Sequence, residues 1–215
     1  IYTYHQPIEG FRNDTELIEM WKTSWRARCW QPIVLDESDA IRHEQFSFLD
    51  QKLSALPTVN FKLYERACYI RYLALSAIGG GVSVDNDVIN MGFWPSDVPD
   101  PLPDRLHVSD SHIPTLMYAT AREYDRVIHW MANYNMTAED HYRGRPHISD
   151  MWMMVKLLKE KMVEPIVENP FFSNNNGSKK LVHVSTEFML WVRKVIGIEA
   201  LDKKRLTAIA LLFSD

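Results

Sequence analysis

Short runs of strand-forming residues alternate with longer helical patterns, and this alternation limits what the chain can fold into more than any other feature. Aromatic and β-branched residues predict a first strand in IYTYH, before Gln6 and Pro7, and a second strand over Ile33–Leu35. Between them, apolar side chains three or four residues apart predict a helix over residues 15–30. Strand, helix and strand in this order indicate an α/β fold, with ligands expected beyond the carboxyl ends of the strands.

The alternation continues over the rest of the chain. Periodicity predicts helices over residues 39–49, 64–78, 122–134 and 148–163, strands at 82–87, 106–108, 115–118 and in LVHV, and closing helices from Thr186 and Asp202. The 215 residues suit one core, so we expect a single domain over 1–215 with a central mixed, mainly parallel sheet flanked by helices. Because the chain lacks an initial Met and ends abruptly at LLFSD, we expect it to be excised from a longer multidomain chain.

Charge and composition argue against several classes of protein. A net charge of -4 and the lack of a basic run argue against a nucleic-acid partner, because phosphate binding needs a basic face. No stretch reaches the roughly 18 consecutive apolar residues of a membrane span. The polar opening is unlike a signal peptide, so we expect a cytoplasmic protein. Cys29 and Cys68 lack the spacing of a metal site or a disulfide framework, and we expect both to be buried thiols.

The segment GGGVSVDND, residues 79–87, raises a question of charge. Its three glycines are expected to end the preceding helix, because glycine adopts left-handed dihedrals at little cost. In an extended strand, Asp85 and Asp87 point the same way, with Cα atoms about 6.5 to 7 Å apart. Their charges repel unless a cation lies between them, and carboxylate oxygens suit Mg²⁺, Mn²⁺ or Ca²⁺. Asp-Asn-Asp is also a common turn composition, so a metal site and a plain turn both stay open.

The run RACYIRYLALSAIGGGVSVDNDV resembles the DXD region of glycosyltransferases with the GT-A fold, in which a helix, a Gly-Gly turn and a strand lead to Asp-x-Asp. With YTYHQP, WKTSWRARCWQPIVLD, PHISDMW and LVHVS, the chain is similar to the N-terminal glycosyltransferase domain of multidomain chlorella-virus proteins. The resemblance implies sugar transfer from a UDP-sugar donor to a glycan acceptor with retention of anomeric configuration, in viral glycan synthesis in the host cytoplasm. It implies Mn²⁺ or Mg²⁺ as cofactor and further domains in the same chain. Relatives carry Asp at the position of Cys68, so the donor sugar stays open between glucose, rhamnose and others.

The resemblance also implies roles for individual residues. Asp85 and Asp87 match the carboxylates that hold the metal and contact the ribose, and His183 matches a third metal ligand. Asp150 matches a catalytic carboxylate beneath the donor sugar. The other nucleotide-sugar contacts are implied at Thr3, Tyr4, His5, Asp36, Arg71, Asn86, His147 and Ser149.

Plainer interpretations stay open beside these roles. Without the resemblance, His183 and Tyr4 are typical of residues packed in a core. Arg71 is typical of a surface salt bridge, and Asp36 of a turn. Ser149 or Asp150 is typical of a helix cap. Trp94, in the Pro-rich loop after the acidic motif, is a candidate for stacking on an acceptor sugar. Two other classes of function also remain, a metal-dependent phosphohydrolase and a catalytically silent sugar-binding domain.

Overall fold

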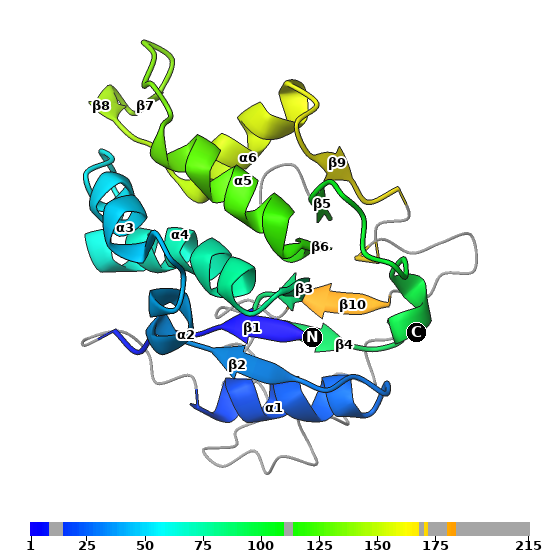
Figure 1. The fold of residues 1–215 in the computed structure, drawn as a ribbon. Coiled ribbons are helices and arrows are strands. Elements are labelled where there is room, and N and C mark those ends of the chain that lie inside the picture. The colour runs from blue at the N-terminus through cyan, green and yellow to red at the C-terminus, as the bar shows by residue number, and fades with distance from the viewer. Residues whose placement is uncertain (9–14, 110–113, 168–169, 172–179, 184–215) are drawn as a thin grey trace.

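The computed structural model describes residues 1–8, 15–109, 114–167, 170–171 and 180–183, which form an α/β fold (Figure 1). Six strands make a mixed sheet with helices on both faces. Helix α1 (Thr15–Arg26) covers one face, and α4 (Lys62–Ala77) and α5 (Ala121–Ala132) cover the other (Figure 1). The predicted α/β class with a helix-flanked sheet is confirmed. The closing helices predicted from Thr186 and Asp202 lie outside the described residues.

The strand order of the sheet is β2 (Ile33–Leu35), β1 (Tyr2–Tyr4), β3 (Gly80–Val84), β6 (Leu116–Thr120), β5 (His107–Val108) and β9 (Glu164–Pro165). Neighbouring strands are parallel at β1–β2, β1–β3 and β5–β9, and antiparallel at β3–β6 and β5–β6. The sheet is therefore mixed, as predicted. Two antiparallel pairs stand apart from it, β4 (Val88–Asn90) with β10 (Leu181–His183) and β7 (His141–Tyr142) with β8 (Arg145–Pro146).

Two short helices follow β2 where the sequence predicts one. Helix α2 (Glu37–Ile41) begins after Asp36, whose carboxylate accepts the Ser38 N–H at 2.8 Å, while Asp39 accepts the Asp36 N–H at 3.1 Å. This reciprocal capping box fixes the start of the helix earlier than its apolar pattern suggests. Helix α3 (Phe46–Ser54) follows after a break. The prediction of one continuous helix in this region is therefore wrong.

Helix α1 ends earlier than predicted, at Arg26. Cys29 has a φ of 62°, in the left-handed region, and an α-helix cannot continue through that conformation. Cys29 is exposed in this turn, whereas Cys68 is half-buried, and neither cysteine forms a disulfide. The prediction of a buried thiol is therefore wrong for Cys29.

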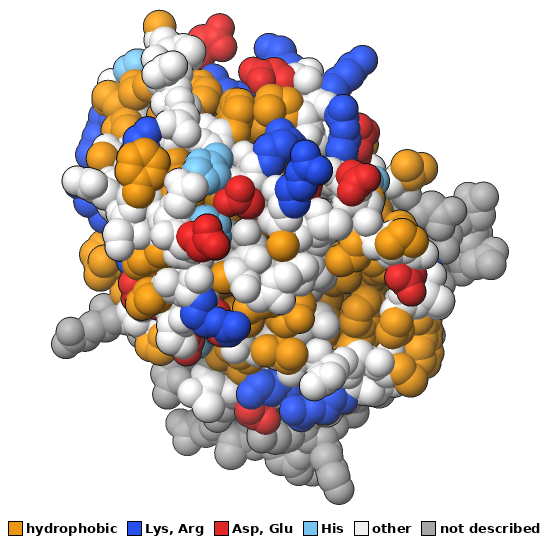
Figure 2. Space-filling view, viewed as in Figure 1, with side chains coloured by type: hydrophobic (Ala, Val, Ile, Leu, Met, Phe, Trp, Pro, Cys, Tyr) orange, Lys and Arg blue, Asp and Glu red, His pale blue; other side chains and the backbone are white. Residues whose placement is uncertain are grey.

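Helix α6 (Asp150–Lys159) and the 3-10 turn η1 (Pro95–Asp97) complete the described helices. Within the described part of the chain, no helix has both the length and the apolar character that crossing a membrane requires. On the face shown in Figure 2, acidic and basic side chains are interspersed rather than gathered into one charged surface.

Two hydrophobic cores fill the two faces of the sheet. Side chains alternate along a strand, so in β6 Met117 joins the core under α4 and α5, while its neighbour Leu116 joins the core under α1. Trp21 and Trp25 of α1 are fully buried in this second core. Because β1 and β3 lie between two packed layers, their carboxyl ends are held on a rigid base.

The glycine triplet allows β3 to pass close to the start of α5. The sequence predicts that the three glycines end α4, but only Gly79 does so, because Gly80 and Gly81 already belong to β3. At Gly80, φ is +83° and a Cβ would meet the backbone of Thr120 and Ala121. Only glycine fits this conformation and this space without strain.

Candidate functional site

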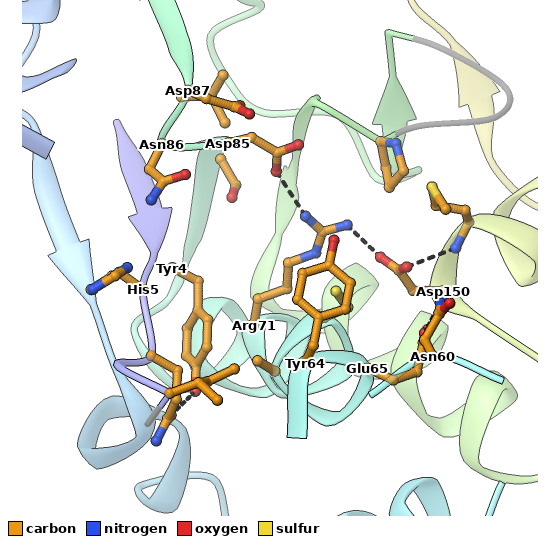
Figure 3. A pocket seen from close by; sticks show the side chains of 18 residues that line it. Tyr4, His5, Asn60, Tyr64, Glu65, Arg71, Asp85, Asn86, Asp87 and Asp150 are labelled. Carbon is orange, nitrogen blue, oxygen red and sulfur yellow. Dashed lines mark hydrogen bonds and ion pairs between the residues drawn. The ribbon is translucent and has the colours of Figure 1, made fainter. Parts of the chain in front are cut away.

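A pocket of about 440 Å³ opens at the carboxyl ends of β1 and β3 (Figure 3). The chain runs from β1 to β2 on one side and later returns to β3 on the other side of β1. The crevice beyond such a reversal of strand order is where open α/β sheets bind ligands. The lining comes from the end of β1, the first part of α4, the turn after β3 and the start of α6.

The acidic motif lies in a turn rather than in a strand. Strand β3 ends at Val84, the Val88 N–H donates to the Asp85 carbonyl at 3.1 Å, and β4 then begins. The sequence prediction of a strand through Asp87 is therefore wrong at its end, and strand alternation does not set the direction of the two carboxylates. The turn nevertheless brings Asp85, Asn86 and Asp87 to the pocket wall.

Arg71 of α4 connects two acidic side chains at the centre of the pocket (Figure 3). Its Nη1 donates to Asp85 Oδ1 at 2.9 Å, and its Nη2 donates to Asp150 Oδ2 at 2.5 Å. The exposed fractions of these side chains are 12% for Arg71, 29% for Asp85 and 4% for Asp150. The surface salt bridge considered for Arg71 is therefore wrong, because both ion pairs are largely shielded from water.

Burial also changes the pKa values of the Asp85 and Asp150 carboxyl groups. It raises the pKa of Asp85 to about 7, although the neighbouring Arg71 acts in the opposite direction. It raises the pKa of Asp150 as well, again against the effect of Arg71. Positive charge close by favours the ionised form of a buried carboxylate. The pocket therefore favours a cationic group beside Asp85 and Asp150.

A second ion pair lies beside the first. His183, at the end of β10, places Nε2 at 3.2 Å from Asp87 Oδ2, and the hydrogen bond to Asp87 raises the pKa of His183. Arg71 pairs with Asp85 and His183 pairs with Asp87, so each of the two aspartates has a partner of its own, which answers the question of charge repulsion. The core packing considered for His183 is wrong, because 41% of its side chain is exposed.

The donor atoms at Asp85 and Asp87 are compatible in type with a divalent cation. Asp87 Oδ1 is buried and has no hydrogen-bond partner among the described residues. An unpaired buried carboxylate oxygen is costly, and a hard cation would satisfy it. In the described ranges, no group of three or more His, Cys, Asp and Glu side chains is arranged to hold a metal. Asp85, Asp87 and His183 are thus suitable ligands by chemistry, but they are not assembled into a closed metal centre.

At the start of α6, Ser149 and Asp150 have different roles, whereas the sequence leaves either residue as the helix cap. Ser149 is the helix cap, because its side chain accepts the Trp152 N–H at 3.1 Å. Asp150 is the first helical residue, and its carboxylate extends to Arg71 in the pocket. The capping interpretation therefore holds for Ser149, while Asp150 faces the site.

The predicted residues divide into those that the pocket brings together and those that it does not. The first group lines the pocket and consists of Tyr4, His5, Arg71, Asp85, Asn86, Asp87 and Asp150. The core packing considered for Tyr4 is therefore incomplete, since its half-buried ring packs against one core and also lines the pocket. His183 contacts this group through Asp87.

Thr3, Asp36, His147 and Ser149 lie outside the pocket. Thr3 is fully buried in β1, where its neighbour Tyr4 takes the pocket-facing position. Asp36 uses its carboxylate to cap α2. His147 accepts the Val59 N–H through Nδ1 at 3.3 Å, so its ring is occupied beneath the loop before α4. The predicted contacts of these four residues with the nucleotide-sugar are therefore not supported, because their side chains are already engaged in local capping and packing.

The sequence does not predict three polar pocket residues on and before α4: Asn60, Tyr64 and Glu65. Tyr64 and Cys68 precede Arg71 by seven and three residues, the spacing of one helix face, so the sequence carried a signal for Tyr64. Glu65 had no such signal, because the burial of its carboxylate depends on α6. Trp94 is exposed outside the pocket, with the Arg28 guanidinium 5.5 Å from its ring centroid.

In comparisons with protein-family models, with curated proteins and with solved structures, nothing matched this chain.

Proposed function

We propose that the protein is a metal-dependent glycosyltransferase of the GT-A type, which moves a sugar from a UDP-sugar donor to a glycan acceptor with retention of configuration. One observation carries the proposal: Asp85, Asp87, Arg71 and Asp150 converge on one pocket at the switch point of the sheet. A carboxylate pair can hold the divalent cation that binds a nucleotide diphosphate, and a further carboxylate close by can act on the sugar. This pocket offers both.

The turn after β3 is the part of the pocket suited to the diphosphate. Asp85 and Asp87 would hold Mn²⁺ or Mg²⁺, with His183 beside them, and a divalent cation stabilises the negative charge that develops on a departing diphosphate. Tyr4 and His5, at the end of β1, also line the pocket (Figure 3), and an aromatic ring there can stack on the base. The nucleotide would thus lie along the carboxyl ends of β1 and β3.

Asp150 is the group suited to the reacting sugar carbon. Its Oδ1 accepts the Met151 N–H at 2.8 Å and its Oδ2 accepts from Arg71, so the carboxylate has a fixed direction. Arg71 favours the ionised form of Asp150, which can stabilise the positive charge that forms when the anomeric bond breaks, or attack that carbon transiently. A carboxylate in this role is compatible with retention of configuration.

The donor sugar and the biological setting are proposed from the resemblance to GT-A glycosyltransferases. Cys68 lines the pocket as a half-buried thiol in place of a hydroxyl-binding carboxylate, so glucose and rhamnose both stay in the proposal as donor sugars. A role in viral glycan synthesis, in the cytoplasm of a host cell and within a longer multidomain chain, belongs to the same proposal.

The test is product analysis with a panel of UDP-sugars and Mn²⁺, first with water and then with added glycans as acceptors. We expect release of UDP and a free sugar of retained configuration. Asp150→Asn should lower kcat by about 10²-fold or more, while Asp104→Asn, a change at an exposed residue outside the pocket, should leave it unchanged.

Three outcomes would contradict the proposal in different ways. Phosphate release from a sugar-free ester would indicate a phosphohydrolase. UDP-sugar binding without turnover would indicate a silent binding domain. An inverted product anomer in the NMR spectrum would reject retention.

A further inference from the structure

Glu65 of α4 is a buried carboxylate in the pocket wall to which no role has been given so far. It is 3% exposed, and burial raises its pKa. Its Oε2 accepts from Asn60 Nδ2 at 2.7 Å, and its Oε1 accepts the backbone N–H of Asp150 at 3.3 Å. Glu65 thus accepts a hydrogen bond directly from Asp150, the residue proposed for catalysis.

The N–H groups at the start of α6 have side-chain acceptors. A helix leaves its first N–H groups without partners in its own backbone. Here the Trp152 N–H donates to Ser149 Oγ at 3.1 Å, the Met151 N–H to Asp150 Oδ1 at 2.8 Å, and the Asp150 N–H to Glu65. Glu65 therefore caps α6 from another helix, at the end where the helix dipole favours negative charge.

Helix α4 holds Asp150 at two points. Arg71 fixes the side chain through Oδ2, and Glu65 fixes the main chain through the amide N–H. A carboxylate suits this second position because it can accept from Asn60 and from the Asp150 amide together. A glutamine would offer one oxygen for two donors and turn an NH₂ group toward the other donor.

We propose that Glu65 is a positioning residue, which fixes the first turn of α6 and thereby the direction of the Asp150 carboxylate. The proposal rests on the proposed function of Asp150 for its effect on turnover. The contact between Glu65 and the Asp150 amide can be tested without turnover.

The first measurement compares the variant Glu65→Gln with the double variant Asn60→Asp/Glu65→Gln. The double variant exchanges donor and acceptor, because an aspartate at 60 accepts from the new amide while the glutamine oxygen faces the Asp150 N–H. For UDP-sugar turnover we expect Glu65→Gln to lower kcat by about 10-fold with KM changed less than about twofold, since a small displacement of a reacting group is enough for such a loss. The double variant should recover most of kcat. A kcat for Glu65→Gln equal to that of the wild type, or no recovery in the double variant, would overturn the proposal.

The second measurement is amide hydrogen exchange by NMR in the same proteins, with the Ile128 amide inside α5 as the internal reference. We expect the Asp150 amide to exchange about 10-fold faster in Glu65→Gln and to regain protection in the double variant. Unchanged exchange at Asp150 would overturn the positioning role. If the wild type turns over no UDP-sugar, the proposed function fails, and the exchange rates still decide whether Glu65 holds Asp150.

Discussion

Arg71 is the residue on which the charge balance of the pocket depends. Its guanidinium lies between Asp85 and Asp150, and all three side chains are largely removed from water. Without this cation, the two carboxyl groups would either stay charged in a medium of low polarity or take up a proton, and both cost stability. Removing one partner of a buried ion pair is far more costly than removing one partner of a surface pair.

We therefore predict that Arg71→Met lowers the free energy of unfolding at pH 7 by about 3 to 5 kcal/mol. Arg42→Met is the matched control, because Arg42 is 63% exposed and pairs with Asp39 at 3.5 Å. The control should cost less than about 1 kcal/mol. Urea denaturation of both variants measures the difference, and equal losses would contradict the buried charge network.

At the scale of elements, one buried carboxylate anchors the segment between α5 and α6, which includes the strand pair β7–β8. Asp140 is fully buried, and its Oδ2 accepts the Tyr134 hydroxyl at 2.8 Å and the Thr137 N–H at 2.6 Å. Its Oδ1 accepts from Trp152 Nε1 and from Lys156 Nζ, each at 2.8 Å. Asp140 thereby ties the end of α5 to the side of α6, the helix that carries Asp150.

This anchor predicts a specific dependence of stability on pH. Burial alone would raise the pKa of Asp140, but hydrogen bonds from Lys156 and Thr137 outweigh it and hold the pKa below its ordinary value of 3.8. Because the folded state lowers this pKa, Asp140 stabilises the protein above pH 3.8, and the contribution is lost as the pH falls further. Asp140→Asn should lower Tm at pH 7 and make the decline of stability in acid less steep.

Thermal melts between neutral and acid pH provide the measurement. Glu139→Gln, at the exposed neighbouring position, is the control and should follow the wild type. If the Tm of Asp140→Asn fell with pH as steeply as that of the wild type, Asp140 would not be the anchor.

Local patterns in the sequence predicted which helices and strands exist better than they predicted where those elements begin and end. The strand at Ile33–Leu35 followed from residue type, and the pocket position of Asp85 followed from its place after a strand, at the edge where α/β sheets bind ligands. The split of the helix after β2 did not, because the capping box at Asp36 outweighs the apolar pattern. Glu65 could not be predicted as a pocket residue, because its role depends on the Asp150 amide, 85 residues away in the chain. Contacts between distant elements have no local signature.

At the scale of the whole molecule, the pocket exists because of the strand order. β1 lies between β2 and β3, so the chain leaves it on one side and returns on the other. This arrangement places the aromatic end of β1, the acidic turn after β3 and Arg71 of α4 around one cavity (Figure 3). The helix α6 then adds Asp150 from the second half of the chain. A site built in this way depends on the fold more than on any one motif.

Calorimetric titration of UDP into the protein, with and without Mn²⁺, tests the central claim most directly. We predict binding that requires Mn²⁺, that weakens by about 10-fold or more in Asp87→Ala at unchanged Tm, and that is unaffected in Asp104→Asn. Binding of equal strength without the metal or in Asp87→Ala, or no binding by the wild type, would contradict the claim that this acidic turn holds a metal-bound nucleotide diphosphate.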